Sequence, residues 1–252
     1  MTTTLITGAS SGLGAEMARQ LAARGEDLAL CARRLDRLEA LRDEITARHP
    51  GRRVALRALD VTDADAVPRV FDELRTELGG LDRVVVNAGL GKGAPLGTGR
   101  ADANRETAVT NFVAGLAQVE AAMTGFRAQA SGHLVVVSSI AALRGLPGST
   151  TAYAASKAGI AHLAEGLRLE LLDTRDRIDV TVLFPGYIAS EMNDRADGRG
   201  AGPMMASTAR GVASMVRAIE ARKASAYVPG LPWAPLAVVL RHAPLRLLRR
   251  LV

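Results

Sequence analysis

The sequence predicts an α/β protein built on a doubly wound parallel sheet of about seven strands, flanked by helices. Two observations predict this class. Short runs rich in β-branched residues alternate with longer stretches whose apolar residues recur at helical spacing. The short runs are almost continuously hydrophobic, as strands buried on both faces of a sheet are. Strand and helix in alternation favour right-handed crossovers between parallel strands.

The predicted strands are spread along the whole chain, at 3–7, 27–31, 53–59, 82–87, 133–138, 179–184 and 225–229. Helices are expected between them, and the first should end near Gly25, a residue typical of helix C-termini. The stretches 90–102 and 185–206 follow neither period. Long loops in compact domains often cover binding sites, so a substrate lid is expected at about 186–206.

Composition excludes several classes of protein. The 252 residues are 48% hydrophobic, which is enough for one sizeable core. A net charge of +6 would suit nucleic acid, but aromatic residues make up only 3% and the body has no long basic run, so no nucleic-acid partner is expected. The single cysteine, Cys31, and the lack of a signal-like start predict a cytoplasmic location. No metal site is expected.

A glycine-rich turn, "TGASSGLG" (7–14), follows the first strand and opens a helix. Such a turn lets a ligand approach the backbone, and the helix N-terminus behind it favours a pyrophosphate. The spacing differs from the usual G-x-G-x-x-G fingerprint, so a turn that only needs flexibility is the alternative. The segment also fits the G-x-S-x-G elbow of serine hydrolases. Its place on the first strand and the scattered histidines oppose that interpretation.

Residues that could bind a ligand recur where the predicted strands end. Asp60, Asn87, Ser139 and Pro185 each lie at or just after such an end, and parallel strands bring these ends to one edge, where ligands bind. After the second strand comes Ala32-Arg33-Arg34, where NAD-binding proteins commonly have an acid. An arginine here can pair with a 2′-phosphate, which favours NADP(H) over NAD(H). The alternative is a solvated arginine.

Tyr153 and Lys157 lie one helical turn apart in "TAYAASK" (151–157) and should share one helix face. An ammonium ~4 Å from the phenol, at an effective dielectric of ~20, could lower the tyrosine pKa by up to ~3. The phenol would then take part in proton transfer near neutral pH. The alternative is a Tyr–Lys pair stacked at the surface.

Taken together, these motifs resemble the short-chain dehydrogenase/reductase family. The resemblance rests on "TGASSGLG", "NAG" (87–89), Asn111, "VVSSIAAL" (136–143), "YAASK" (153–157) and "PGYIAS" (185–190), in order and spacing, and covers roughly residues 3–230. It implies one Rossmann-type dinucleotide-binding and catalytic domain at 1–230. It also implies hydride transfer between a small-molecule carbonyl compound and an alcohol.

The resemblance implies four catalytic residues, Asn111, Ser139, Tyr153 and Lys157. Tyr153 would give or take the proton, and Lys157 would lower its pKa and hold the nicotinamide ribose. Ser139 would hydrogen-bond the substrate oxygen, and Asn111 would hold a water in a proton relay. The spacing from Ser139 to Tyr153 is one residue longer than expected, so Ser138 is an alternative for the serine.

The same resemblance implies which residues line the cofactor. The glycine turn would line the phosphates, Arg33 would take the 2′-phosphate, and Asp60 and Val61 would contact the adenine. Asn87 would stabilise the sheet edge at the cofactor, and Ile188 and Ser190 would lie near the carboxamide. In chain order, the residues that would line the cofactor are Gly8, Ser10, Ser11, Gly12, Leu13, Gly14, Arg33, Arg34, Asp60, Val61, Asn87, Ala88, Gly89, Tyr153, Lys157, Pro185, Gly186, Ile188 and Ser190.

A basic amphipathic extension is expected at 231–252. It holds the only tryptophan, Trp233, and four arginines without an acid, and Pro244 should break its helical pattern. Docking on the body or a partner subunit and contact with an anionic membrane surface both stay open. By resemblance, a homodimer or homotetramer is expected.

The expected substrate is apolar or lipid-like. A 3-oxoacyl group on an acidic carrier is the alternative within the class, because a basic surface would suit such a carrier. A membrane-attached nucleotide-binding protein without turnover is the alternative from another class.

Overall fold

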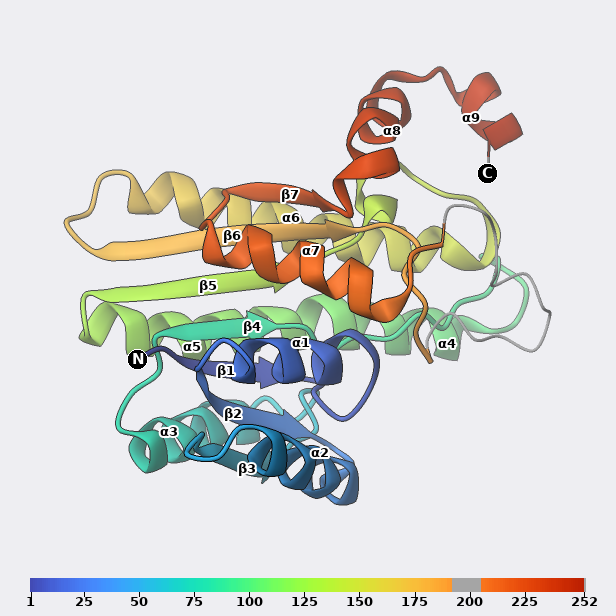
Figure 1. Ribbon diagram of the computed structural model, residues 1–252. Coiled ribbons are helices and arrows are strands. Elements are labelled where there is room, and N and C mark those ends of the chain that lie inside the picture. Colours follow the sequence, from blue (N-terminus) through green and yellow to red (C-terminus); the bar gives the residue numbers. More distant parts are fainter. Residues whose placement is uncertain (192–204, 252) are drawn as a thin grey trace.

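The computed structural model describes residues 1–191 and 205–251 and contains the predicted parallel sheet (Figure 1). Its seven strands run in the order β3-β2-β1-β4-β5-β6-β7, and every neighbouring pair is parallel. Each predicted strand is present, with bounds that differ by at most two residues. The strands are β1 Thr3–Thr7, β2 Asp27–Ala32, β3 Val54–Ala58, β4 Arg83–Val86, β5 Ser131–Val137, β6 Arg177–Pro185 and β7 Ser225–Val228.

Helices cover both faces of the sheet (Figure 1). On one face lie α1 Gly12–Ala22, α2 Leu35–Arg48 and α7 Thr208–Glu220, and on the other lie α3 Ala66–Leu78, α5 Ala114–Ala128 and α6 Thr151–Leu171. The layers form because each helix buries one apolar face. In α7, for example, Val212, Met215, Val216 and Ile219 recur at helical spacing and are all fully buried.

Two segments at the carboxyl edge of the sheet are irregular. The loop after β4 runs without regular structure to residue 100 and is followed by α4 Ala101–Ala108. Asn104 holds this loop through two hydrogen bonds of 3.0 Å, one to the Ala94 N–H and one to its carbonyl. A π-helical turn, η1 Val109–Val113, joins α4 to α5. After β5 come the 3₁₀ turns η2 Ile140–Leu143 and η3 Gly148–Thr150, which lead into α6.

The C-terminal extension forms two helices, α8 Gly230–His242 and α9 Leu245–Leu251, with the break at Pro244 that the sequence predicts. The inner face of α8 packs on the body, because Trp233 and Ala237 are buried against Ile140. Arg144 closes the end of α8 by donating to the carbonyls of Arg241 (3.1 Å) and Ala243 (3.0 Å). Within the described ranges, no helix is both long and apolar enough to cross a bilayer.

A buried polar network ties the strands together at the amino edge of the sheet, opposite the glycine turn. The Arg83 guanidinium donates to the Glu26 carboxylate (2.7 Å) and, through Nε, to Nδ1 of His133 (3.1 Å). Since Nδ1 accepts, Nε2 carries the ring proton and donates to the Thr181 hydroxyl at 2.8 Å. Burial, with the Arg83 charge, lowers the His133 pKa to about 3, so the ring is neutral.

Candidate active site

The glycine turn forms a close-packed cradle between β1 and α1. Gly8 has a positive φ of 65°, and a Cβ there would lie 2.9 Å from Ala88 Cα. A Cβ on Gly14 would lie 2.5 Å from the Gly8 carbonyl oxygen. Ser11 precedes α1 without capping its first turn through the side chain. Glycine is therefore needed at both positions, because the backbone of the turn packs too closely against the chain around it for a side chain to fit. The binding of a pyrophosphate at the N-terminus of α1 stays a prediction.

The ends of β1 and β4 are joined by Asn87 and Thr7. The Asn87 side chain donates to the Thr7 carbonyl at 2.9 Å, and the backbone N–H groups of Asn87 and Ala88 both donate to the Thr7 hydroxyl at 3.0 Å. Asn87 therefore stabilises the sheet edge beside the cradle, as expected. Thr7 is a part of this edge that sequence analysis missed, because a strand threonine carries no distinguishing signal.

Arg34 is the arginine that reaches the glycine turn. Its guanidinium donates to the hydroxyls of Ser11 (2.8 Å) and Ser10 (3.2 Å). It also lies 3.4 Å from the Glu191 carboxylate, which pairs more closely with Arg37 (2.7 Å). These pairs lower the Glu191 pKa, and Arg37 has the larger effect. The sequence indicated Arg33, the residue before Arg34, as the partner of a 2′-phosphate. It did not indicate that Glu191 would lie beside Arg34.

Arg33 and the end of β3 form the outer part of this edge. Arg33 is exposed, and Asp60 follows β3 beside it. The Asp60 carboxylate accepts from the Thr62 N–H (3.0 Å) and hydroxyl (2.8 Å). The Thr62 N–H lowers the Asp60 pKa most, and the Arg33 charge lowers it further. The next residue, Val61, is buried.

Ser139 and Tyr153 meet above the end of β5. The Ser139 hydroxyl forms a hydrogen bond with the phenol and lowers its pKa, although burial raises that pKa more strongly. Ser138 is turned away: it is buried, and its hydroxyl donates to the Lys157 carbonyl at 2.7 Å. Of the two serines that the sequence left open, the structure therefore brings Ser139 to Tyr153.

Lys157 lies on the same face of α6 as Tyr153, as the spacing predicts. Its Nζ lies 6.0 Å from the centroid of the phenol ring and donates to the Val137 carbonyl at 2.9 Å. Burial lowers the Lys157 pKa to about 8. The expectation that Lys157 lowers the Tyr153 pKa is wrong for this ligand-free structure. Burial raises the phenol's pKa, and Lys157 is not among the groups that lower it.

Asn111 stands in the π-helical turn, where an extra residue per turn rotates its side chain toward the loop after β4. The amide group exchanges two hydrogen bonds with the Leu90 backbone (2.8 and 2.9 Å) and donates to the Ser156 hydroxyl (3.1 Å). A Cβ on Gly89 would lie 3.0 Å from Asn111 Oδ1 and 3.2 Å from Lys157 Nζ. Asn111 therefore holds the loop beside Lys157, and the relay water stays a prediction.

The chain after β6 brings the last predicted residues to the same edge. Gly186 faces Trp233 so closely that a Cβ would lie 2.0 Å from its ring. Ile188 is buried and bridges to Ala206, and Ser190 approaches Gly12. The segment 192–204 of the predicted lid lies outside the described residues.

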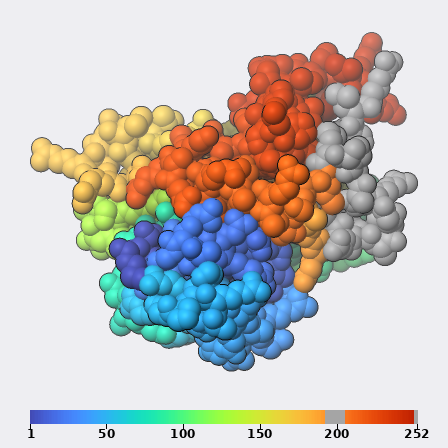
Figure 2. Space-filling view, viewed as in Figure 1, coloured from blue at the N-terminus to red at the C-terminus, as the bar shows by residue number. Residues whose placement is uncertain are grey.

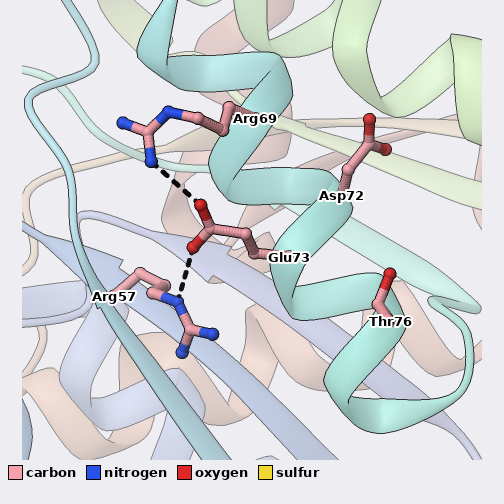
Figure 3. A pocket seen from close by; sticks show the side chains of 5 residues that line it. All are labelled: Arg57, Arg69, Asp72, Glu73 and Thr76. Atoms are coloured by element: carbon pink, nitrogen blue, oxygen red, sulfur yellow. Dashed lines mark hydrogen bonds and ion pairs between the residues drawn. The ribbon is translucent and has the colours of Figure 1, made fainter.

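A surface hollow between β3 and α3 is lined by Arg57, Arg69, Asp72, Glu73 and Thr76 (Figure 3), and none of these is a predicted site residue. Its charges satisfy one another. The Glu73 carboxylate accepts from Arg57 (2.8 Å) and Arg69 (2.9 Å), as the dashed lines show. Charged side chains protect the edge strand β3, and the hollow is no part of the site.

Comparison with known proteins gives the same family as the motifs. The family model "short chain dehydrogenase" matches residues 2–199. An uncharacterised oxidoreductase of Mycobacterium tuberculosis is 52% identical over 246 residues, which cover 98% of this chain and 95% of that protein. A short-chain dehydrogenase from Sphingobium yanoikuyae, solved with NADPH, superposes with a TM-score of 0.83 at 27% identity over 99% of this chain and 96% of its own. A short chain dehydrogenase/reductase from Burkholderia phymatum, solved in complex with NAD, has the same fold (TM-score 0.85, 23% identity, 98% of this chain and 95% of its own).

Proposed function

This chain belongs to the short-chain dehydrogenase family of oxidoreductases, and on that premise we propose that it interconverts a ketone or aldehyde and an alcohol with NADP(H). One observation carries the chemistry: the Tyr153 phenol lies beside the Ser139 hydroxyl, and the buried Lys157 Nζ lies 6.0 Å from the centroid of the phenol ring. These groups stand at the edge of the sheet that holds the glycine cradle. A bound nicotinamide would supply or accept the hydride.

Tyr153 is suited to act as the acid in carbonyl reduction. Its raised pKa keeps the phenol protonated near neutral pH, so it can donate to a carbonyl oxygen. Ser139, already bonded to the phenol, would hold the same oxygen in line with that proton. Lys157, with a pKa of about 8, can exist in both protonation states near neutral pH and lies next to the loop that Asn111 fixes. In the reverse direction, Tyr153 would take the proton of the alcohol.

The proposal is tested by turnover with NADPH on a panel of apolar ketones, aldehydes and 3-oxoacyl thioesters, followed by absorbance. Tyr153→Phe should lose about 10²–10⁴-fold in kcat, the contribution typical of a general acid. Tyr227→Phe is the matched control, because it also removes one phenol hydroxyl. Tyr227 lies on β7 and packs against Phe184 of β6. Full turnover in Tyr153→Phe would remove the phenol from the mechanism.

The preference for NADP(H) is supported by Arg33 and Arg34 at the end of β2. Arg34 lies on the serines of the glycine turn, and Arg33 offers an exposed second charge. Alanine variants at both positions should raise the KM for NADPH and leave that for NADH unchanged. An equal rise for both cofactors would refute the 2′-phosphate assignment.

An apolar substrate is supported by the side chains beside Ser139. Ile140 follows it directly and is buried against Trp233, whose ring meets Tyr187 edge-on at 5.4 Å. Such a wall favours an apolar group next to the carbonyl. The substrate panel tests this too: a preference for small polar carbonyl compounds would contradict it.

We also propose a cytoplasmic homodimer or homotetramer. The location is supported by the single, buried cysteine, Cys31. The assembly is supported by three exposed apolar residues, Val113 just before α5 (54%), Leu169 near the end of α6 (63%) and Leu172 just after it (74%).

A further inference from the structure

The C-terminal helices carry apolar side chains on two opposite faces. The inner face of α8 is buried on the body through Trp233 and Ala237. The outer face holds Val238 and Val239, which are 60% and 45% exposed. A helix with apolar residues on every face is normally buried on every face, but the body of the protein covers only the inner face of α8.

The exposed apolar residues are concentrated in this part of the chain. Of the twelve large apolar side chains that are exposed among the described residues, five lie within 231–247. We call these five the tail surface: Leu231, Val238, Val239, Leu245 and Leu247. Figure 2 shows the two helices, in red, standing out from the body at its upper right. A projecting apolar surface of this kind marks an interaction site.

The charged side chains within the tail itself, 231–252, are of one sign. Arg241, Arg246 and Arg249 are exposed beside the tail surface, and no aspartate or glutamate follows Glu220. If a second copy of the chain paired through the same surface, its arginines would lie against the arginines of the first. Like charges oppose such a contact. An anionic lipid surface complements both features, since it neutralises the arginines and takes up the leucine and valine side chains.

We propose that the tail surface is a peripheral membrane-binding site for anionic lipid. α8 stands at the carboxyl edge of the sheet, the edge that carries Tyr153 (Figure 1). Its inner face contacts the chain after β6, through Gly186 and the Tyr187 ring. A bilayer on the outer face would therefore lie on the same edge of the molecule as Tyr153. Binding itself does not depend on the proposed reaction.

Flotation of the full-length protein tests the proposal. We expect it to float with vesicles of equal parts phosphatidylcholine and phosphatidylglycerol, and to stay at the bottom with phosphatidylcholine alone. Arg241→Gln/Arg246→Gln/Arg249→Gln should reduce the partition coefficient on the order of 100-fold, about fivefold per arginine. Val238→Ser/Leu245→Ser should also reduce it and leave the charge unchanged.

The matched control is Arg175→Gln/Arg177→Gln/Lys223→Gln. These three cations are exposed at the opposite edge of the sheet. Arg175 and Lys223 lie in the α6–β6 and α7–β7 turns, Arg177 is the first residue of β6, and their removal changes the net charge equally. The control should float like the wild type. The proposal is overturned if the wild type does not float with anionic vesicles. It is also overturned if both triple variants lose binding equally, because net charge alone would then explain it.

Discussion

At the scale of single residues, the site has two opposing influences on one phenol. Burial raises the Tyr153 pKa, and the hydrogen bond with Ser139 lowers it. Lys157, which the spacing suggested as the cause of a lowered pKa, bonds the Val137 carbonyl instead. Spacing on a helix fixes which residues share a face, but it does not fix the direction in which a long side chain extends. For that reason the sequence predicted that Tyr153 and Lys157 share a helix face, but it did not predict the direction of the Tyr153 pKa shift.

Tyrosine titration of the ligand-free protein should show this sign. The difference between the ultraviolet titrations of wild type and Tyr153→Phe isolates the Tyr153 phenolate, which should form only above pH ~10, the ordinary tyrosine value. Ser139→Ala removes the influence that lowers the pKa, so its phenolate should form at still higher pH. Ser139→Thr keeps a hydroxyl and should restore the wild-type curve. Phenolate formation near pH 7 would contradict the prediction.

Glu191 should weaken the binding of a 2′-phosphate. Its carboxylate lies against Arg37 and Arg34, the latter on the serines of the cradle. Glu191→Gln removes this competitor and should tighten NADPH binding by up to about fivefold, the upper range for an exposed ion pair, without changing NADH binding. Glu220→Gln, which breaks an ion pair with Arg24 elsewhere, is the control. Fluorescence titration gives both affinities, and an equal gain for the two cofactors would refute the assignment.

At the scale of elements, the sequence predicted the strands and helices whose apolar residues follow a regular pattern. Buried parallel strands are almost continuously apolar, so all seven were recognisable and only their ends shifted. The sequence did not predict the π-helical turn at Asn111, because one extra residue in a helical turn hardly changes the apolar pattern. It also missed the network around Arg83 and His133, which depends on contacts between residues up to 79 positions apart.

The His133 network predicts a specific pH dependence of stability. The folded pKa of about 3 lies below the ordinary value of 6.5, so the unfolded chain binds one more proton between these limits. Stability should therefore fall as pH drops from about 6.5 toward 3, by ~1.4 kcal/mol per pH unit. Urea unfolding of wild type and His133→Gln at several pH values measures it. The variant should lack this part of the slope, and identical slopes would disprove the prediction.

At the scale of the whole molecule, the exposed residues Leu169 and Leu172 bear on assembly. If they lie in a subunit interface, Leu169→Glu/Leu172→Glu should separate the oligomer into monomers of 26.4 kDa, as measured by light scattering on a sizing column. Leu96→Glu, at an equally exposed leucine in the loop after β4, is the control and should leave the mass unchanged. A wild-type protein that already has the monomer mass would rule out the proposed assembly.

The parallel sheet keeps two kinds of polar cluster apart. Arg83 and Glu26 stand where strands begin, and Ser139 and Tyr153 stand beyond the end of a strand. A strand of five to seven residues separates these groups by roughly 15–20 Å, which is beyond the range in which substitutions normally influence one another. Substitutions at the amino edge of the sheet can therefore change the stability of the fold without changing the chemistry at the carboxyl edge. Substitutions that stabilise the fold can therefore be sought first around Arg83 and Glu26, where they should leave the reaction unchanged.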